Sequence, residues 1–450
     1  MRTSPSTIAL LAPVLAVGTI VAVAPPSQAA TEIAVTTTDD ELNADGDCSL
    51  REAVVALNTG TTSDACMVAD DVGRITLQPG ATYRLTIPGA DEDAALTGDL
   101  DILLPVSIEA REGYDTSPAT IDAGGLDRVF DIHESAYPFR VSLAFLLLTN
   151  GDAGAGDGGG VRISPRACDP NDAGSLRSID LWGVIIDGNR ALRGGGVFAG
   201  GCNGLVITAS SIVRNSAGDV GGGIAVEGDS YLDIEGSTVP TNEAEVAGGG
   251  IWTAITHPFA SWSAFASTIG YNRAPEGGGL WAEEYGQAFT TIVAANDGGN
   301  CGGPQPASAG LSDDDSCGGP GVADAGLRPL AIVAGYPVHL LEDHSPAIER
   351  AGPVADGAWC SDNLQYDQIG TFRPQDGDGD GVAACDVGSI EAPGVPVESA
   401  EPSAPPLPDT AVHLIAPPKT DRARQRWAWL SCWRQRWGRL PAGRWGCAPG

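Results

Sequence analysis

The chain has 450 residues and a net charge of −33, from 58 acidic and 25 basic residues. A body this acidic repels phosphate backbones, so the composition excludes nucleic acid as a partner and favours cations or surfaces that carry them. The ten cysteines form no CxxC pair, which disfavours zinc. Those of the body fall into sequential couples, so we expect local disulfides and an oxidising compartment. The couples are Cys48 and Cys66, Cys168 and Cys202, Cys301 and Cys317, and Cys360 and Cys385.

Residues 1–30 read as a secretory signal peptide. Arg2 precedes an apolar run over residues 8–23, and the small residues Ala29 and Ala30 stand where a signal peptidase cleaves. We therefore expect a secreted protein that is extracellular or associated with the cell wall. We expect no transmembrane span in its mature chain.

Residues 31–70 predict a cap for the N-terminal end of the fold. Ser49 and Glu52 match a capping box, in which each side chain accepts a hydrogen bond from the backbone N–H of the other residue. Apolar residues then recur on one helical face, which predicts a short amphipathic helix from residue 50 to about residue 58. A stack of repeats needs its first turn covered, and a helix fixed by a Cys48–Cys66 bridge would cover it.

The string CSLREA, residues 48–53, is the name-giving motif of the CSLREA domain family. The Thr/Asp-rich stretch before it and Ala56-Leu57-Asn58 after it also resemble that family. The resemblance implies a secreted or surface β-helix protein without an established reaction. Arg51 and Glu52 could form a catalytic pair, but a role in fixing the cap helix suits them better.

Residues 71–300 carry short apolar strands, which from residue 147 onward follow one repeated pattern. An aliphatic residue, two variable positions and Asn are followed by a run of glycines and another aliphatic residue. A period of about 20–50 residues with one turn motif per repeat is typical of a solenoid. Stacked repeats lie about 4.8 Å apart, so equivalent asparagines can form a ladder of amide hydrogen bonds. The predicted ladder is Asn150, Asn189, Asn215, Asn242, Asn272 and Asn296.

This pattern resembles the repeat of the polymorphic outer membrane proteins, which pairs Gly-Gly-aliphatic with aromatic/aliphatic-x-x-Asn. Here Leu, Ile or Val stands where that family usually has Phe. The resemblance implies a surface-exposed and often adhesive β-helix. We predict an all-β fold, a right-handed parallel β-helix (solenoid) with a short N-terminal α-helical cap and a disordered C-terminal tail. We expect a monomer.

Residues 301–392 predict the last rungs and a C-terminal cap. They resemble the choice-of-anchor Q domain, which typically reads SPAIDAG, DQRG, RP and CDIGAxE. The chain departs from that pattern at Glu349-Arg350 and at Ile369. The resemblance implies a β-helix cap that precedes a surface anchor. The matching strings are Ser345-Pro346-Ala347-Ile348, Asp367-Gln368-Ile369-Gly370, Arg373-Pro374, and Cys385-Asp386-Val387-Gly388 with Glu391.

An acidic loop interrupts this segment. Alternating carboxylates followed by Gly381 are the way an EF-hand-type loop surrounds calcium with oxygen atoms. The last position of such a loop holds Val387 instead of Glu, with an aspartate beside it. The sequence therefore indicates a calcium site, with a solvated acidic loop as the alternative. The expected ligands are Asp376, Asp378, Asp380 and Asp386.

Residues 393–450 begin with a Pro-rich linker. Residues 407–411, LPDTA, resemble the LPxT[G/A] sorting signal that a sortase cuts after Thr. Such a signal precedes an apolar span of about 18 residues, but a segment rich in Arg and Trp follows here. We interpret it as a degenerate or frame-shifted anchor, with a cationic membrane-surface segment as the alternative.

Two functions stay open at this point. The first is a non-catalytic surface protein, an acidic rod for adhesion or for binding an extracellular carbohydrate or protein ligand. The second is a polysaccharide lyase or glycoside hydrolase that acts on an external groove. We favour the first, because the body has no lysine and its histidines are scattered. Trp252 and Trp281 could stack on a sugar or pack in the core. The candidate catalytic residues of the second are Arg190, Arg193, Arg214, Arg273, Asp187 and Asp219.

Overall fold

The computed structural model describes ten stretches of the chain. The predicted signal peptide, Pro-rich linker, sorting-like signal and tail lie outside them, as do Cys168 and Cys360. Within them, strands in long parallel sheets dominate, and the helical elements are α1 (Leu50–Thr59) and the 3-10 turn η1 (Asp315–Cys317). The prediction of an all-β parallel fold is confirmed. The described residues are 31–68, 72–90, 92–111, 116–133, 139–167, 177–256, 261–284, 286–304, 308–351 and 365–394.

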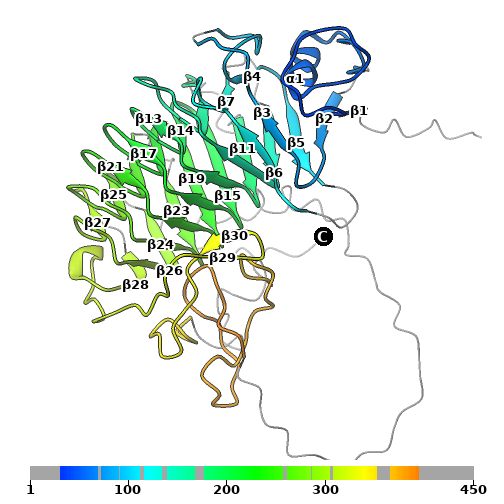
Figure 1. The fold of residues 1–450 in the computed structure, drawn as a ribbon. Helices are drawn as coiled ribbons and strands as arrows, with labels where there is room; N and C mark the ends of the chain where they lie inside the picture. The colour runs from blue at the N-terminus through cyan, green and yellow to red at the C-terminus, as the bar shows by residue number, and fades with distance from the viewer. Residues whose placement is uncertain are drawn as a thin grey trace, which may run out of the picture. The chain divides into compact units, whose positions relative to one another are not determined.

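Strands of successive repeats pair in parallel with one another in three sheets (Figure 1). The largest has 17 strands: β1 (Thr31–Ala34), β2 (Val72–Leu77), β3 (Thr82–Arg84), β5 (Val106–Ala110), β6 (Ala119–Asp122), β8 (Arg140–Ala144), β9 (Leu146–Thr149), β11 (Arg177–Trp182), β12 (Ile185–Asp187), β15 (Asn203–Thr208), β16 (Ser211–Val213), β19 (Tyr231–Glu235), β20 (Thr238–Pro240), β23 (Trp262–Phe265), β24 (Thr268–Gly270), β26 (Gln287–Ala294) and β28 (Ser308–Ser312).

The second sheet has eight strands: β4 (Leu100–Ile102), β7 (Phe130–Ile132), β10 (Val161–Ile163), β14 (Val197–Ala199), β18 (Ile224–Gly228), β22 (Ile251–Ile255), β25 (Leu280–Ala282) and β27 (Cys301–Gly302). The third contains β13 (Arg190–Ala191), β17 (Ser216–Ala217) and β21 (Glu243–Ala244). An antiparallel hairpin, β29 (Ala331–Val333) and β30 (Tyr336–Val338), forms a separate sheet that packs against β16 and β20.

Inward-facing aliphatic side chains lie in register from one repeat to the next and form the core. Val197, Ile224 and Ile251 occupy equivalent positions on β14, β18 and β22 and are at most 1% exposed. No single strand of three to five residues could bury such a face alone, so the core exists only because the repeats are stacked.

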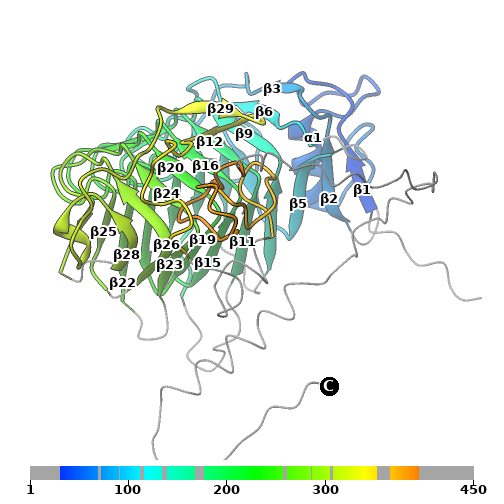
Figure 2. The same ribbon diagram turned by 90° about the horizontal axis from the view of Figure 1, so that it is seen from below.

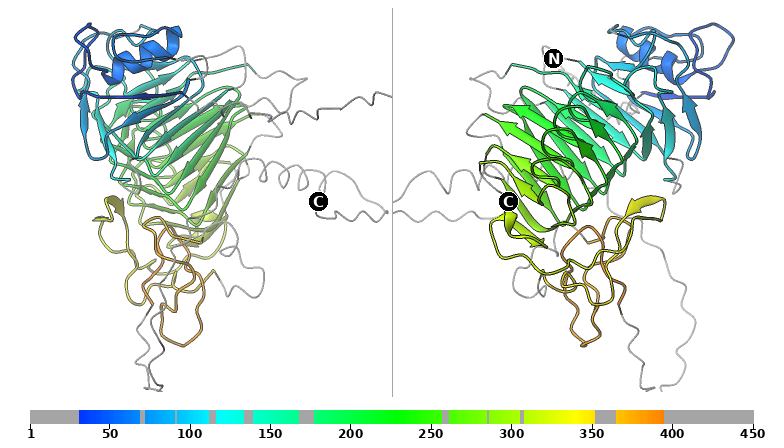
Figure 3. Two further views of the ribbon diagram at one scale, coloured as in Figure 1. Left: turned by 90° about the vertical axis from the view of Figure 1, so that its right-hand side faces the viewer. Right: turned by 60° about the vertical axis from the view of Figure 1, so that its left-hand side comes forward.

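The helix predicted within residues 31–70 is present as α1 (blue in Figure 3), and it packs against β2 and β4. The capping box forms: Ser49 accepts a hydrogen bond from the Glu52 backbone, and Glu52 accepts one from the Ser49 backbone. A disulfide joins Cys48 to Cys66 with a Cα–Cα distance of 5.0 Å. The helix, its capping box and the disulfide together hold this segment next to the first strands.

A ladder of asparagine side chains runs along one corner of the stack. In each step the backbone N–H and the side-chain amide of one Asn donate to Oδ1 of the Asn in the next repeat, as from Asn215 to Asn242 at 2.9 and 3.0 Å. The five asparagines in these steps are Asn189, Asn215, Asn242, Asn272 and Asn296.

Asn150 does not belong to this ladder, contrary to the sequence prediction. Leu148, rather than Leu147, pairs with Ile186, so Asn150 falls one position early, at the turn residue with φ of 56°. Its side chain donates to Asp122 instead. The ladder position belongs to Gly151, whose N–H donates to Asn189, and a Cβ there would lie 1.9 Å from a carbonyl oxygen.

The ladder also extends one step beyond the prediction. Asn296 donates to Asn300, and the side-chain amide of Asn300 donates to Asp313 at 2.6 Å. The backbone N–H of Asn300 donates to Asp314, and its side-chain amide also donates to Ser312, so these residues accept the last donors of the ladder. The disulfide Cys301–Cys317 holds this closing loop beside β27 and β28.

A second ladder at the opposite end of the short strands was not foreseen. The backbone N–H of Ser210 donates to Ser237 Oγ at 3.1 Å, that of Ser237 to Ser267 Oγ, and that of Ser267 to Thr291 Oγ1. Each hydroxyl stands five residues before a ladder asparagine in the sequence. That constant spacing is the signal that could have revealed it.

The segment of residues 365–394 lies along the flank of the 17-stranded sheet as well as on its last strands (Figure 2). Gln368 donates to the Ser210 carbonyl and to Ser211 Oγ, and accepts from Thr238 at 2.5 Å. Arg373, 3% exposed, donates to two carbonyls of its own segment and pairs with Glu391 at 2.9 Å. The motif residues of this segment therefore act as internal supports.

Two further observations concern the remaining cysteines and the helices. Cys202 and Cys385 are disulfide-bonded, and their expected partners lie outside the described stretches. None of the helices in the described part of the chain has the length and apolar character that a membrane crossing needs.

Candidate functional site

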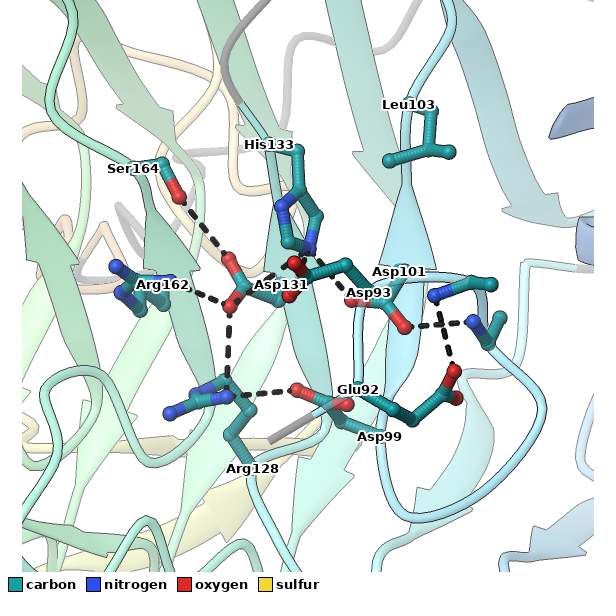
Figure 4. Close-up of polar contacts among 12 residues, drawn as sticks. Glu92, Asp93, Asp99, Asp101, Leu103, Arg128, Asp131, His133, Arg162 and Ser164 are labelled. Atoms are coloured by element: carbon teal, nitrogen blue, oxygen red, sulfur yellow. Dashed lines mark hydrogen bonds and ion pairs between the residues drawn. The ribbon is translucent and has the colours of Figure 1, made fainter. Parts of the chain in front are cut away.

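A dense group of charged and titratable side chains lies at the N-terminal end of the eight-stranded sheet (Figure 4). Asp101, Asp131 and Arg162 are the central residues of β4, β7 and β10, and the register places them side by side on the outer face. Asp99 precedes β4, and His133 follows β7. These residues, together with Arg128, are called the acidic cluster below.

Every carboxylate of the acidic cluster takes part in a hydrogen bond with another group of the protein. Asp101 accepts a hydrogen bond from the backbone of Ala95 at 2.6 Å and lies 2.5 Å from Nε2 of His133. Asp131 accepts from Arg162 at 2.6 Å, and Arg128 donates to Asp99 at 3.0 Å. The three aspartates are at most 2% exposed.

Burial shifts the proton affinities of these groups. Burial, with the charges of Asp101 and Asp127, raises the pKa of Asp99 to about 8 despite Arg128. Burial also raises the pKa of Asp101, although the hydrogen bond from His133 opposes it. Burial alone would lower the pKa of His133, but the bond to Asp101 and the neighbouring carboxylates outweigh it and raise the pKa.

The loop of residues 92–98 lies against the cluster. Glu92 accepts backbone hydrogen bonds from Ala94, Leu96 and Thr97 and so fixes the loop internally. Arg51 connects this loop to α1, and its side chain is 0% exposed. Its guanidinium donates to the backbone carbonyls of Ala95, Gly98 and Asp99. It also pairs with Asp40 at 2.6 Å. Arg51 thus connects the helix, Asp40 and this loop.

The cluster contains donor sets that suit a metal ion, and Asp99, Asp101, Asp131 and His133 in these sets are engaged in hydrogen bonds. Ligand atoms of Asp93, Asp101 and His133, and of Asp99, Asp101 and Asp131, lie within 4.8 Å of one another. Metal binding would require those bonds to break, because a ligating imidazole nitrogen must be deprotonated.

The predicted calcium ligands are brought together only in part. Ligand atoms of Asp378 and Asp380 lie within 4.8 Å of one another and of Glu349, which the sequence reading did not include. Asp376 accepts backbone hydrogen bonds from Gly379 and Gly381 of the same loop. Asp386 is 2% exposed and accepts from the backbones of Glu349 and Ala392, so its carboxylate supports the fold instead.

The candidate catalytic arginines and aspartates of the Asn turns do not form a common site. Arg214 pairs with Asp187, and Arg193 pairs with Asp157 and Glu227. Exposed Arg273 lies near Glu243 and Asp297 at 3.6 and 3.4 Å, and Arg190 is exposed. Asp219 stands one repeat after Asp187, before the next glycine run.

Trp252 and Trp281 lie on the outer face of the eight-stranded sheet, partly exposed, and not in the core. Their rings stack with centroids 5.8 Å apart and planes 13° apart.

The acidic cluster itself was not foreseen from the sequence. Its signal is a charged residue between two apolar ones in three successive repeats, at Leu100-Asp101-Ile102, Phe130-Asp131-Ile132 and Val161-Arg162-Ile163. No family model matches this chain, and neither a curated protein nor a solved structure matches it.

Proposed function

We propose that this protein is a secreted, right-handed parallel β-helix that binds a carbohydrate or another surface ligand outside the cell without catalysing a reaction. The parallel register from repeat to repeat supports the solenoid, and the packing of α1 against β2 and β4 supports its role as a cap. The disulfides support an oxidising compartment.

The observation that carries the non-catalytic reading is the closure of the acidic cluster. A general acid or base must come within hydrogen-bond reach of the reacting group. Here Asp99, Asp101 and Asp131 are at most 2% exposed and are bonded to protein groups. A ligand would therefore contact the outer surface of the sheets, which the acidic composition makes unattractive to polyanions.

A polysaccharide panel tests this proposal. The protein is expected to bind at least one polysaccharide and to release neither reducing ends nor unsaturated products from any of them. Product release that disappears in Asp101→Asn would establish an enzyme instead.

One observation favours that second candidate, a polysaccharide hydrolase or lyase. With a pKa of about 8, Asp99 keeps its proton at neutral pH, as a general acid must, and it lies beside the hydrogen-bonded pair of Asp101 and His133. The 92–98 loop would have to open before a substrate could reach these groups.

We also propose a calcium ion at the acidic loop, held by Asp376, Asp378 and Asp380 with Glu349. Alternating carboxylates and the nearby Glu349 give the all-oxygen donor set that calcium takes. Calcium at about 100 times its Kd should stabilise the protein by about 2.7 kcal/mol. The midpoint of thermal unfolding should rise with calcium and fall with chelator, and Asp378→Asn should remove this response. An equal response in Asp378→Asn would contradict the assignment.

A further inference from the structure

The outer face of the eight-stranded sheet changes character along the stack. The central outward residue of each strand is Asp101, Asp131, Arg162, Phe198, Ala225, Trp252, Trp281 and Gly302, in that order. The column is therefore charged at the N-terminal end and apolar toward the C-terminal end.

Most of this column is closed to ligands. The charged members are held in the acidic cluster. Phe198 is 0% exposed, and the guanidinium of Arg193 lies 4.7 Å from its ring centroid. Arg193 is itself held by Asp157 and Glu227. Among the described residues of the column, Trp252 and Trp281 are the aromatic ones with exposed surface.

The two indole rings form a stepped surface. Their planes are 13° apart, and the centroid distance of 5.8 Å exceeds the strand spacing of about 4.8 Å, so one ring is displaced sideways from the other. The next position along the column is Gly302, where a Cβ would lie 3.0 Å from Cδ1 of Trp281. Because residue 302 is a glycine, no side chain of β27 projects from that position against the Trp281 ring.

Carboxylates flank the rings. In the adjoining outward column Glu227 pairs with Ala254, and exposed Glu283 follows one residue beyond the last pair of β22 and β25. The small Ala254 thus lies between two acids beside the tryptophans. Glu227 already pairs with Arg193, so the exposed carboxylate of Glu283 is the one that can accept hydrogen bonds from sugar hydroxyls.

We propose that Trp252 and Trp281, with Glu227 and Glu283 beside them, bind an uncharged polysaccharide by stacking its pyranose rings on the indoles. This site deepens the proposed function and rests on it. An indole offers a large apolar face to the C–H side of a sugar ring. The flanking acids and the net charge of −33 repel uronate, sulfate and phosphate groups, and so exclude acidic glycans and anionic lipid surfaces.

The experiment measures binding of the full chain to xylan, β-glucan, mannan and chitin, with polygalacturonate and hyaluronan as acidic comparisons. Trp252→Ala and Trp281→Ala should each weaken binding to the uncharged ligand about tenfold. Trp182→Ala is the matched control, since Trp182 is 46% exposed but belongs to the other large sheet and packs on Phe145. It should bind as the unaltered protein does.

Each outcome decides a separate point. Binding to an uncharged polysaccharide that survives both substitutions would overturn the site but leave the proposed function standing. Binding to the acidic polysaccharides alone would overturn the ligand class, and binding to none would remove the support for a carbohydrate ligand altogether. If the variants misfold, oxidation of the unaltered protein by N-bromosuccinimide replaces them. Bound polysaccharide should then protect Trp252 and Trp281 but not Trp182, and equal oxidation of all three would overturn the site.

Discussion

At the scale of single residues, Arg51 has the largest predicted effect on stability. Its removal would leave the buried carboxylate of Asp40 and the carbonyls of the 92–98 loop without their donor. We expect Arg51→Ala to lower the free energy of unfolding by about 3–5 kcal/mol. Urea unfolding measures this loss. Arg74→Ala is the control, because the Arg74 side chain is 49% exposed and its pair with Glu109 is worth at most about 1 kcal/mol. Equal losses in the two variants would contradict the assignment.

The buried Asp99 predicts a pH dependence of stability. Its pKa is about 8 in the folded protein, above the unfolded value of about 3.9, so folding favours the protonated form. This contribution is fully present below pH ~4 and is lost as pH rises through about 8. Asp99→Asn keeps an oxygen for Arg128 without a charge. Its stability relative to the unaltered protein should rise by more than ~1 kcal/mol between pH 5 and 9.

Chemical unfolding at several pH values provides the measurement. Asp93→Asn serves as the control because Asp93 is 82% exposed, and its difference from the unaltered protein should stay small across the same range. A constant difference for Asp99→Asn would show that Asp99 is ionised throughout.

At the scale of the repeated turn, the Asn ladder predicts unequal effects for asparagines that look alike in the sequence. Asn242 is 1% exposed and links the repeats on both sides, so Asn242→Ala leaves the buried N–H of Asn215 without an acceptor. Each buried group left unpaired costs about 1–3 kcal/mol. Asn150→Gly should change stability by less than about 1 kcal/mol, because Gly suits its positive φ. Thermal unfolding of both variants tests this difference, and similar losses would contradict it.

The repeated turn was predictable because its period is visible in one dimension. The position of Asn150 was not predictable, because it depends on whether Leu147 or Leu148 aligns with Ile186 of the next repeat. The acidic cluster was also hidden, since Asp101, Asp131 and Arg162 meet only after the register of three repeats is known. Short sequence motifs predicted the capping box of α1. They did not predict the contact of Gln368 with Ser210, which lies in a much earlier repeat.

At the scale of the whole molecule, the disulfides at the first and last strands predict where unfolding begins. Cys48–Cys66 and Cys301–Cys317 close loops with sequence separations of 18 and 16, each worth about 3 kcal/mol. After reduction, amide hydrogen exchange should rise first in β1, β2, β27 and β28, while the inner strand β19, which unlike β15 does not follow a disulfide-bonded cysteine, keeps its protection. A uniform rise along the chain would mean that all repeats unfold as one cooperative unit.

The asparagine ladder also bears on how such a chain can change in evolution. Every inner repeat receives one hydrogen-bonding pattern from the repeat before it and passes the same pattern on. The partners differ at the two ends, where Gly151 begins the ladder and Ser312, Asp313 and Asp314 close it. Duplication of one such segment in the gene would lengthen the molecule by about 4.8 Å and create no junction of a new kind. Length can therefore vary among descendants of this protein while both ends stay the same.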